Sequence, residues 1–326
     1  MTASAADGVP ERPCPLCGAG GVRPVLETAA RSAQGAPYRV VACTDCGLRY
    51  TRPLPTPDEF LALYPTDYHV RNSPRLWSRD FARVLLERWV MSERRRCIAG
   101  IPPGRVLDVG CGNGAFLASL RDHGWDVQGT DTSATACELT RAKGVPAHHG
   151  ELRGAGFPAA SFDVVTLFHV LEHLPEPLAE LVEVRRVLRP EGRLVVHVPD
   201  NDSVTLRLCG ARWLPLDVPR HLQHYTHESL RQTLARAGFT IVRERRGQPT
   251  DVAASFYSFL RCPLPPERGH IRYYAKDYKS ASLAARVRFL AVGLPVLAGC
   301  LLYTPGIRAL TGHCETLTAT CRPESL

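Results

Sequence analysis

Apolar and polar positions in the middle of the chain predict buried strands that alternate with amphipathic helices. The clearest case is residues 105–120, RVLDVGCGNGAFLASL, in which Val106, Leu107 and Val109 predict a buried strand. Three alternating glycines follow this strand, and a segment with helical spacing comes directly after them. Because glycine has no side chain, the turn lets the backbone approach a bound molecule closely, and the helix directs its first amides at that molecule. The pattern predicts a βα unit that holds a nucleotide-like ligand.

A second strand is predicted at residues 125–129, and Thr130 and Asp131 follow it. Asp131 lies 23 residues after Asp108. A carboxylate at this point can accept hydrogen bonds from both hydroxyls of a ribose. An ordinary dinucleotide-binding fold has the same two features, so the spacing alone does not choose between a nicotinamide and an adenosyl cofactor.

Several motifs together resemble the class I S-adenosylmethionine-dependent methyltransferases, and the resemblance covers about residues 105–247. The motifs are DVGCGNG from Asp108 to Gly114, the carboxylate of Asp131, FDVVTLFHVLEHL at residues 162–174 and LRPEGRLVVHVP at residues 188–199. The resemblance implies an α/β fold with a Rossmann-like sheet of seven strands, mostly parallel with the last one antiparallel. It also implies an enzyme that transfers the methyl group of S-adenosylmethionine.

The resemblance assigns the cofactor-binding residues by position. Asp108 and the glycine loop would hold the methionine end, Asp131 the ribose and Glu151 the adenine, with a solvated loop carboxylate as the alternative for Glu151. Phe168, in the segment at residues 162–174, is expected to line the same site. The expected cofactor-binding set is Asp108, Gly110, Gly112, Gly114, Asp131, Glu151 and Phe168.

Four cysteines near the amino end form two C-x2-C pairs, CPLCG and CTDCG, with 25 residues between them. Four thiolates in this pattern suit tetrahedral zinc, and the glycine after each pair permits the tight turn that such a site needs. A short alternating strand at residues 38–42 lies between the pairs, so a zinc ribbon is expected. Four sulfur ligands leave no open position, so the zinc would be structural. The expected ligands are Cys14, Cys17, Cys43 and Cys46.

The other eight cysteines show no ligand spacing and are expected to be small buried residues. Residues 1–13, MTASAADGVPERP, lack the apolar core of a secretory signal. We therefore expect a reducing, cytoplasmic compartment, in which disulfides are disfavoured.

The size and charge of the chain fit this picture without identifying an acceptor. A chain of 326 residues with 44% apolar content can build one α/β domain with an appendage at each end. We expect residues 1–70 to form the zinc ribbon and a connector, and residues 71–326 the methyltransferase domain with an apolar insertion at about 248–312. The net charge is +8 and the isoelectric point about 9.0, which favours anionic partners such as phosphorylated substrates, acidic lipid or nucleic acid. A basic solvated face without a partner is the commoner explanation.

Residues 289–307 form an uncharged run of 19 residues between Arg288 and Arg308, which is long enough to span a bilayer. Residues 313–322, however, are expected to form the last strand of the sheet beside residues 240–246, which argues against a single crossing. Two interpretations stay open: shallow attachment to the inner membrane surface, and a helix that covers the active site or forms a dimer surface. The basic, tyrosine-rich residues 271–288 suit lipid headgroups or a phosphorylated substrate equally well.

Methyl transfer requires that the acceptor is held against the methyl group and that its proton is accepted. Histidine is suited to accept it because its ordinary pKa is about 6.5. The segment HVLEHL offers His169 with Glu172 and His173, and PRHLQHYT offers three more candidates. For each of them, a structural hydrogen-bonded side chain is the alternative. The expected catalytic candidates are His221, His224, Tyr225 and His169.

The expected function is methyl transfer to oxygen, carbon or nitrogen of a small molecule such as a sugar, a polyketide or a lipid-linked glycan intermediate. The order of ribbon, proline-rich connector and methyltransferase domain resembles small-molecule methyltransferases that include sugar C-methyltransferases. One alternative is an RNA base methyltransferase, and another is a non-catalytic scaffold that binds S-adenosylmethionine at a membrane. The chain lacks the Asn-Pro-Pro-Tyr and Asp-Pro-Pro-Tyr motifs, and its aromatic residues do not interleave with arginines, which argues against a nucleic acid partner.

Overall fold

The computed structural model describes residues 12–33, 35–63, 81–248, 251–261, 296, 298–307 and 309–324. The chain divides into two compact units, each assembled from three ranges. The first, which we call the ribbon unit, comprises Met1–Glu59, Pro199–His227 and Arg246–Leu317. The second, which we call the sheet unit, comprises Phe60–Val198, Glu228–Arg245 and Thr318–Leu326.

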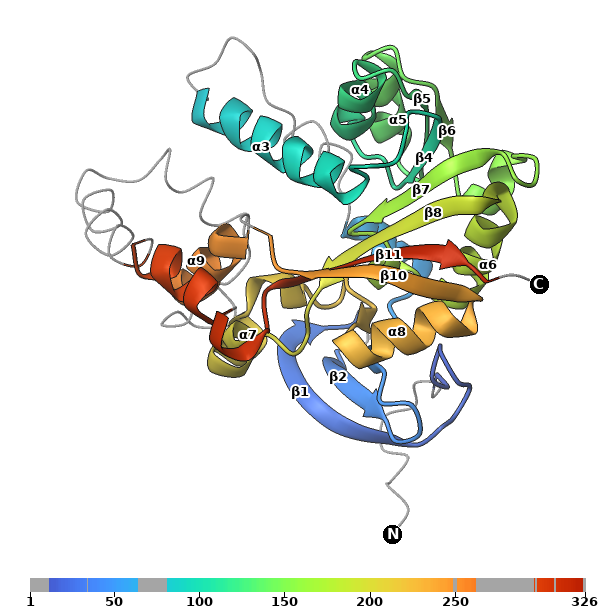
Figure 1. The fold of residues 1–326 in the computed structure, drawn as a ribbon. Helices are drawn as coiled ribbons and strands as arrows, with labels where there is room; N and C mark the ends of the chain where they lie inside the picture. The colour runs from blue at the N-terminus through green and yellow to red at the C-terminus, as the bar shows by residue number, and fades with distance from the viewer. Residues whose placement is uncertain are drawn as a thin grey trace. The chain divides into compact units, whose positions relative to one another are not determined.

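Seven strands form one sheet in the order β10-β11-β8-β7-β4-β5-β6 (Figure 1). The strands are β4 (Arg105–Val109), β5 (Asp126–Asp131), β6 (Ala147–His149), β7 (Phe162–Phe168), β8 (Leu188–Pro199), β10 (Phe239–Arg246) and β11 (Thr316–Pro323). β4 pairs in parallel with β5 and β7, β5 pairs in parallel with β6, and β7 pairs in parallel with β8. The carboxyl ends of these five strands therefore lie at one edge of the sheet. This confirms the predicted Rossmann-like sheet, and β11 lies next to β10 as predicted.

Burial on both faces explains why the central strands are largely apolar. Val106 and Leu107 are fully buried, and Val106 lies opposite Val164 of β7. Phe116 and Leu117 pack against this core from the helix that follows the glycines. The helices formed largely by the sheet unit are α3 (Phe81–Cys97), α4 (Ala115–Arg121), α5 (Ala134–Arg141), α6 (Pro177–Val187) and α8 (His227–Arg236), with the short turns η1 (Leu152–Ala155) and η2 (Leu171–His173).

The ribbon unit contains a four-stranded sheet in the order β1-β2-β3-β9. Neighbouring strands in it are antiparallel. Its strands are β1 (Val22–Arg31), β2 (Pro37–Cys43), β3 (Arg49–Arg52) and β9 (Gln223–His224). The predicted strand at residues 38–42 is therefore present as part of β2. The helical elements of this part are α1 (Pro57–Ala62), α7 (Val204–Cys209), η3 (Gly210–Arg212), η4 (Leu214–Leu216) and α9 (Asp251–Arg261).

A buried carboxylate joins the elements of the ribbon unit that precede β11. Glu315 accepts hydrogen bonds from Trp213 Nε1 at 2.5 Å, from Ser255 Oγ at 2.6 Å and from Thr205 Oγ1. Its backbone N–H donates to Asp251 at 3.2 Å. A buried charge is tolerated only when it is hydrogen-bonded in this way, so the network fixes α7 and α9 against the start of β11.

Residues 298–307 of the predicted apolar run are helical, and residues 309–311 continue the helix. The rest of that run, residues 289–295 and 297, lies outside the described residues, as do residues 271–288. Across the described parts of the chain, every helix is too short or too polar to span a bilayer.

Candidate cofactor and catalytic site

The glycine loop turns sharply from β4 into α4. The φ angles of Gly110, Gly112 and Gly114 are 69°, 57° and 71°, in the region that favours glycine. A Cβ atom on Gly110 would lie 2.5 Å from Cγ2 of Val170, and one on Gly114 would lie 2.9 Å from the Cα atom of Thr140. The backbone conformation favours glycine at all three positions, and at Gly110 and Gly114 a side chain would also lack space.

Asp131, at the end of β5, is bonded directly to this loop. Its Oδ2 accepts from the backbone N–H of Gly112 at 2.9 Å, and its Oδ1 accepts from that of Ser133 at 2.8 Å. Each carboxylate oxygen has a second lone pair, which can accept a hydrogen bond from a ribose hydroxyl. Glu151 is exposed and follows β6, the next strand of the sheet, and the N–H of Gly150 donates to the Asp131 carbonyl at 2.9 Å. The predicted ribose and adenine residues therefore follow neighbouring strands.

Asp108 is a buried carboxylate within β4. Its Oδ1 accepts a hydrogen bond of 2.5 Å from the Thr166 hydroxyl of β7. Burial raises the pKa of Asp108 to about 6, while the positive charge of Arg94 and the Thr166 hydrogen bond oppose this rise and the charge of Asp131 adds to it. Asp108 is thus largely ionised at neutral pH and can attract the ammonium group of a methionine moiety.

Affinity for S-adenosylmethionine is expected to fall as Asp108 takes up its proton. Because the pKa of Asp108 is about 6, the ionised fraction drops about tenfold between roughly pH 7 and pH 5, and the Kd is expected to rise about tenfold over this range. Calorimetric titration at the two pH values measures this change. Asp108→Asn is expected to bind weakly at both pH values, and an equal pH dependence in this variant would contradict the assignment.

Arg94 of α3, which no sequence motif singled out, packs beside the predicted cofactor residues. Its guanidinium Cζ lies 4.7 Å from the centre of the Phe168 ring. Burial lowers the pKa of Arg94, and the negative charge of Asp108 opposes this shift. Among the described residues, no hydrogen bond or ion pair is formed by this guanidinium. Phe168 itself is buried at the end of β7 and contacts Phe116 edge to face at 5.1 Å, so Arg94 covers one side of the predicted cofactor residue.

His169 directly follows β7 and has a strained backbone. Its φ angle is 58°, which is uncommon for a residue other than glycine, and such strain concentrates at functional sites. Nδ1 of His169 lies 3.1 Å from Oε1 of Glu172, whose side chain is buried, and 43% of the histidine side chain is exposed. Its ring meets the ring of His197 edge to face, with centroids 4.6 Å apart. His169 is therefore a fixed but accessible imidazole.

His197 supports this arrangement from within β8. It is buried, its Nδ1 lies 2.9 Å from the Thr318 hydroxyl, and its carbonyl accepts from the His169 N–H at 2.9 Å. Burial lowers the pKa of His197 well below its usual range, and the charges of His169 and Arg94 act in the same direction. His197 consequently stays neutral and packs against His169.

The other three predicted catalytic residues are in the ribbon unit and are buried. Nδ1 of His221 lies 2.8 Å from the Pro215 carbonyl, and Nε2 of His224 lies 2.9 Å from the Thr51 hydroxyl. His224 also belongs to β9, which pairs with β3, and Tyr225 follows it. These contacts give each of the two histidines a structural partner, whereas His169 belongs to the same unit as the cofactor residues.

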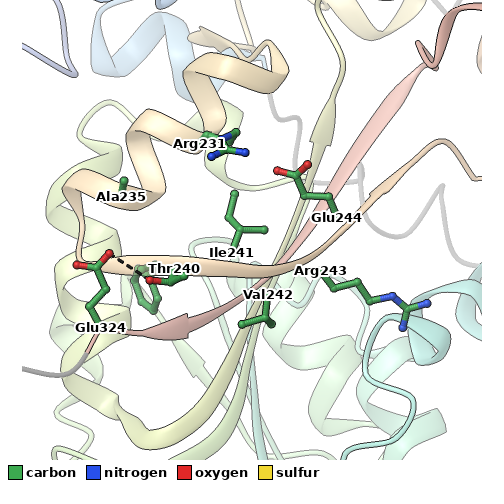
Figure 2. A pocket seen from close by; sticks show the side chains of 9 residues that line it. Arg231, Ala235, Thr240, Ile241, Val242, Arg243, Glu244 and Glu324 are labelled. Carbon is green, nitrogen blue, oxygen red and sulfur yellow. Dashed lines mark hydrogen bonds between the residues drawn. The ribbon is translucent and has the colours of Figure 1, made fainter.

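A groove of about 420 Å³ lies between α8 and β10 (Figure 2). Charged side chains such as Arg231 and Glu244 line it, and the Thr240 hydroxyl donates to Glu324 at 3.2 Å. No predicted cofactor or catalytic residue lines this groove.

The four cysteines of the amino end come together in the ribbon unit. Their sulfur atoms all lie within 4.8 Å of one another, and the Cys14–Cys46 and Cys17–Cys43 distances are both 3.5 Å. Tetrahedral zinc with Zn–S bonds of about 2.3 Å requires sulfur atoms about 3.8 Å apart, so the cluster can hold this metal.

Both cysteine pairs form the same turn. The N–H of Gly18 donates to the Cys14 carbonyl at 2.8 Å, and that of Gly47 donates to the Cys43 carbonyl at 3.1 Å. Burial opposes ionisation of Cys43, but hydrogen bonds from the backbone of Cys46 and Asp45 outweigh it, and the pKa of Cys43 is lowered to about 7. Burial raises the pKa values of Cys14 and Cys46, so the backbone of the second turn favours the thiolate at Cys43 alone.

Comparison with known proteins agrees with this geometry. A family model described as "Methyltransferase domain" matches residues 76–244. A Ubiquinone biosynthesis O-methyltransferase of Cupriavidus pinatubonensis is 28% identical over 177 residues, which cover 50% of this chain and 71% of that protein. The mitochondrial enzyme of the same name from Schizosaccharomyces pombe is 30% identical over 163 residues, covering 47% of this chain and 53% of the relative. The chain thus spans only about half of the second relative.

Two solved structures share the fold. The [4+2]-cyclase SpnF superposes with a TM-score of 0.52 at 20% identity and covers 84% of this chain and 98% of its own. A methyltransferase in complex with the Trm112 activator of Haloferax volcanii gives 0.51 at 16% identity and covers 82% and 97%. Likeness at this identity concerns the fold alone. The family match extends over half of the chain and includes the glycine loop, Asp131 and His169, and the chain therefore belongs to the S-adenosylmethionine-dependent methyltransferases of the class I fold.

Proposed function

We propose that the chain transfers a methyl group from S-adenosylmethionine to a hydroxyl oxygen of a small molecule, with His169 as the general base. The observation that carries this proposal is the pairing of accessible His169 with buried Glu172 at the carboxyl end of β7. β7 lies next to β4, whose carboxyl end carries the glycine loop. In open α/β sheets, ligands bind beyond the carboxyl ends of the strands.

The residues at this edge match the chemistry of the cofactor. Asp108 is suited to its ammonium group, Arg94 to its carboxylate, Asp131 to the ribose and Glu151 to the adenine. When bound, S-adenosylmethionine supplies the methyl group as a sulfonium. Phe168 and Arg94 pack together and limit the access of water to this part of the site.

The Glu172 carboxylate determines which nitrogen of His169 accepts the proton. Nδ1–H donates to Oε1 of Glu172, which leaves the lone pair of Nε2 to accept the proton of the acceptor hydroxyl. The carboxylate then stabilises the imidazolium that forms. The edge contact with neutral His197 holds the ring in place during this step.

The proposed acceptor is a sugar, a polyketide or a lipid-linked glycan intermediate. Two relatives carry the name Ubiquinone biosynthesis O-methyltransferase, which supports an oxygen acceptor over carbon or nitrogen. We also propose that the four-cysteine cluster holds structural zinc, because its four sulfur ligands complete the coordination shell.

Transfer of an isotopically labelled methyl group tests the proposed function. The purified chain is incubated with methyl-labelled S-adenosylmethionine and separate pools of sugars, polyketides and glycolipids, and the products are analysed by mass spectrometry and NMR. A labelled methyl ether is the expected product. A labelled carbon or nitrogen atom would overturn the oxygen assignment, and binding of S-adenosylmethionine without transfer to any pool would favour the scaffold alternative.

A further inference from the structure

The helix at residues 298–307 makes its polar contacts on its inner side. The Tyr303 hydroxyl lies 3.3 Å from that of Thr205, and the Thr304 hydroxyl donates to Ser255 at 3.5 Å. The Tyr303 ring also meets Phe259 of α9 edge to face at 5.2 Å, and Figure 1 shows this helix, in red, beside α9. These contacts all lie within the ribbon unit, so the inner side of the helix is fixed to the buried network around Glu315.

The outer side of the same helix is apolar. Leu301, Leu302 and Leu310 are 56%, 79% and 84% exposed. Every exposed residue described between positions 298 and 310 is uncharged and apolar, namely Ala298, Gly299, Leu301, Leu302, Pro305, Ala309 and Leu310. A helix that faces water normally carries polar residues outside and apolar residues inside. In this helix the exposed side is apolar instead. We call the side that carries Leu301, Leu302 and Leu310 the leucine face.

We propose that the leucine face inserts into the surface of an anionic phospholipid membrane. Arg308 follows residues 298–307, and residues 271–288 contain five basic residues and a single acidic one, Asp277. An exposed apolar helix face in a chain with an excess of basic residues is the combination that binds anionic headgroups and enters the headgroup boundary.

Charge favours a lipid surface over a second copy of the chain as the occupant. Two copies of the chain, each with a net charge of +8, repel one another when they approach through the leucine face. Anionic lipid neutralises these same charges. The proposal is independent of the acceptor and of the catalytic base.

Cosedimentation of the full chain with vesicles tests this proposal. The wild-type chain is expected to pellet with vesicles of phosphatidylcholine and phosphatidylglycerol at low salt, to pellet less at high salt, and to stay in solution with pure phosphatidylcholine. The double variant Leu302→Glu and Leu310→Glu is expected to bind the anionic vesicles at least about tenfold more weakly than the wild type, because two exposed apolar groups are lost. Val182→Glu on α6, where the valine is 59% exposed, is the matched control and is expected to bind like the wild type.

A tryptophan probe keeps the proposal falsifiable should the double variant fold poorly. Leu302→Trp is expected to show fluorescence that is quenched by brominated acyl chains in the anionic vesicles. Wild-type protein that stays in solution with both kinds of vesicle would overturn the proposal, as would equal pelleting of the double variant. A wild-type dimer that becomes monomeric in the double variant, without vesicle binding, would assign the leucine face to a second copy instead.

Discussion

Replacing His169 with alanine is expected to lower kcat for methyl transfer by about 10²–10⁴-fold and to leave the affinity for S-adenosylmethionine unchanged. The variant loses Nε2, the atom proposed to accept the hydroxyl proton, while Asp108, Asp131 and the glycine loop remain. The kcat is measured with the acceptor identified by methyl labelling, and the cofactor Kd is measured by calorimetry. A lower kcat together with an unchanged cofactor Kd distinguishes a base from a residue that only supports the fold.

Two further variants make this test specific. Glu172→Gln keeps the size of the side chain but removes the charge that stabilises the imidazolium, so kcat is expected to fall and its dependence on pH to change. His123→Ala removes an exposed histidine of the sheet unit and is expected to leave kcat unchanged. Equal turnover in His169→Ala would show that another group accepts the proton or that positioning alone is sufficient for the reaction.

The central sheet was predictable because its signals are local. The buried strand β4 is largely apolar, and a turn of glycines and a segment with helical spacing follow it directly, so the residues themselves indicate the βα unit. The position of β11 beside β10 followed from the resemblance to the methyltransferase sheet. In contrast, β9 has two residues, and its pairing with Arg49 and Tyr50 depends on chain segments that are far apart in the sequence. No local pattern indicates such a strand, and the burial of His224 follows from it.

The candidate site also contains residues that a local sequence motif indicates and residues that only the structure identifies. Gly110, Gly114 and Asp131 are part of motifs, and the structure places them together. Arg94 lies in an arginine-rich helix, and the sequence gives no reason to choose it over the neighbouring arginines. Only its packing against the Phe168 ring in the structure distinguishes it from them. The positive φ angle of His169 cannot be read from the sequence, because histidine adopts this conformation in only a small minority of cases. The sequence therefore indicates the glycine loop directly, whereas the geometry that distinguishes His169 from the other histidine candidates is visible only in the structure.

Removal of zinc is expected to unfold the strands next to the four cysteines. Binding of structural zinc contributes about 10–16 kcal/mol in small zinc domains at neutral pH, and this binding energy is also folding energy. β2 ends at Cys43 and pairs with β3, so loss of the metal is expected to release both strands. Metal analysis is expected to give about one zinc per chain. A chelator is expected to lower the Tm and to reduce the strand signal in the circular dichroism spectrum.

Variants of single cysteines separate the metal site from the other thiols. Cys46→Ser removes one ligand and is expected to abolish zinc retention and lower the Tm, whereas Cys209→Ser, at another buried cysteine of the ribbon unit, is expected to retain the metal. Acid is expected to release the zinc as well, since only thiolates bind it and protons compete for them. A chain that is purified without metal and melts at the same temperature before and after addition of zinc would contradict the structural role, because the ribbon sheet would then be stable on its own packing.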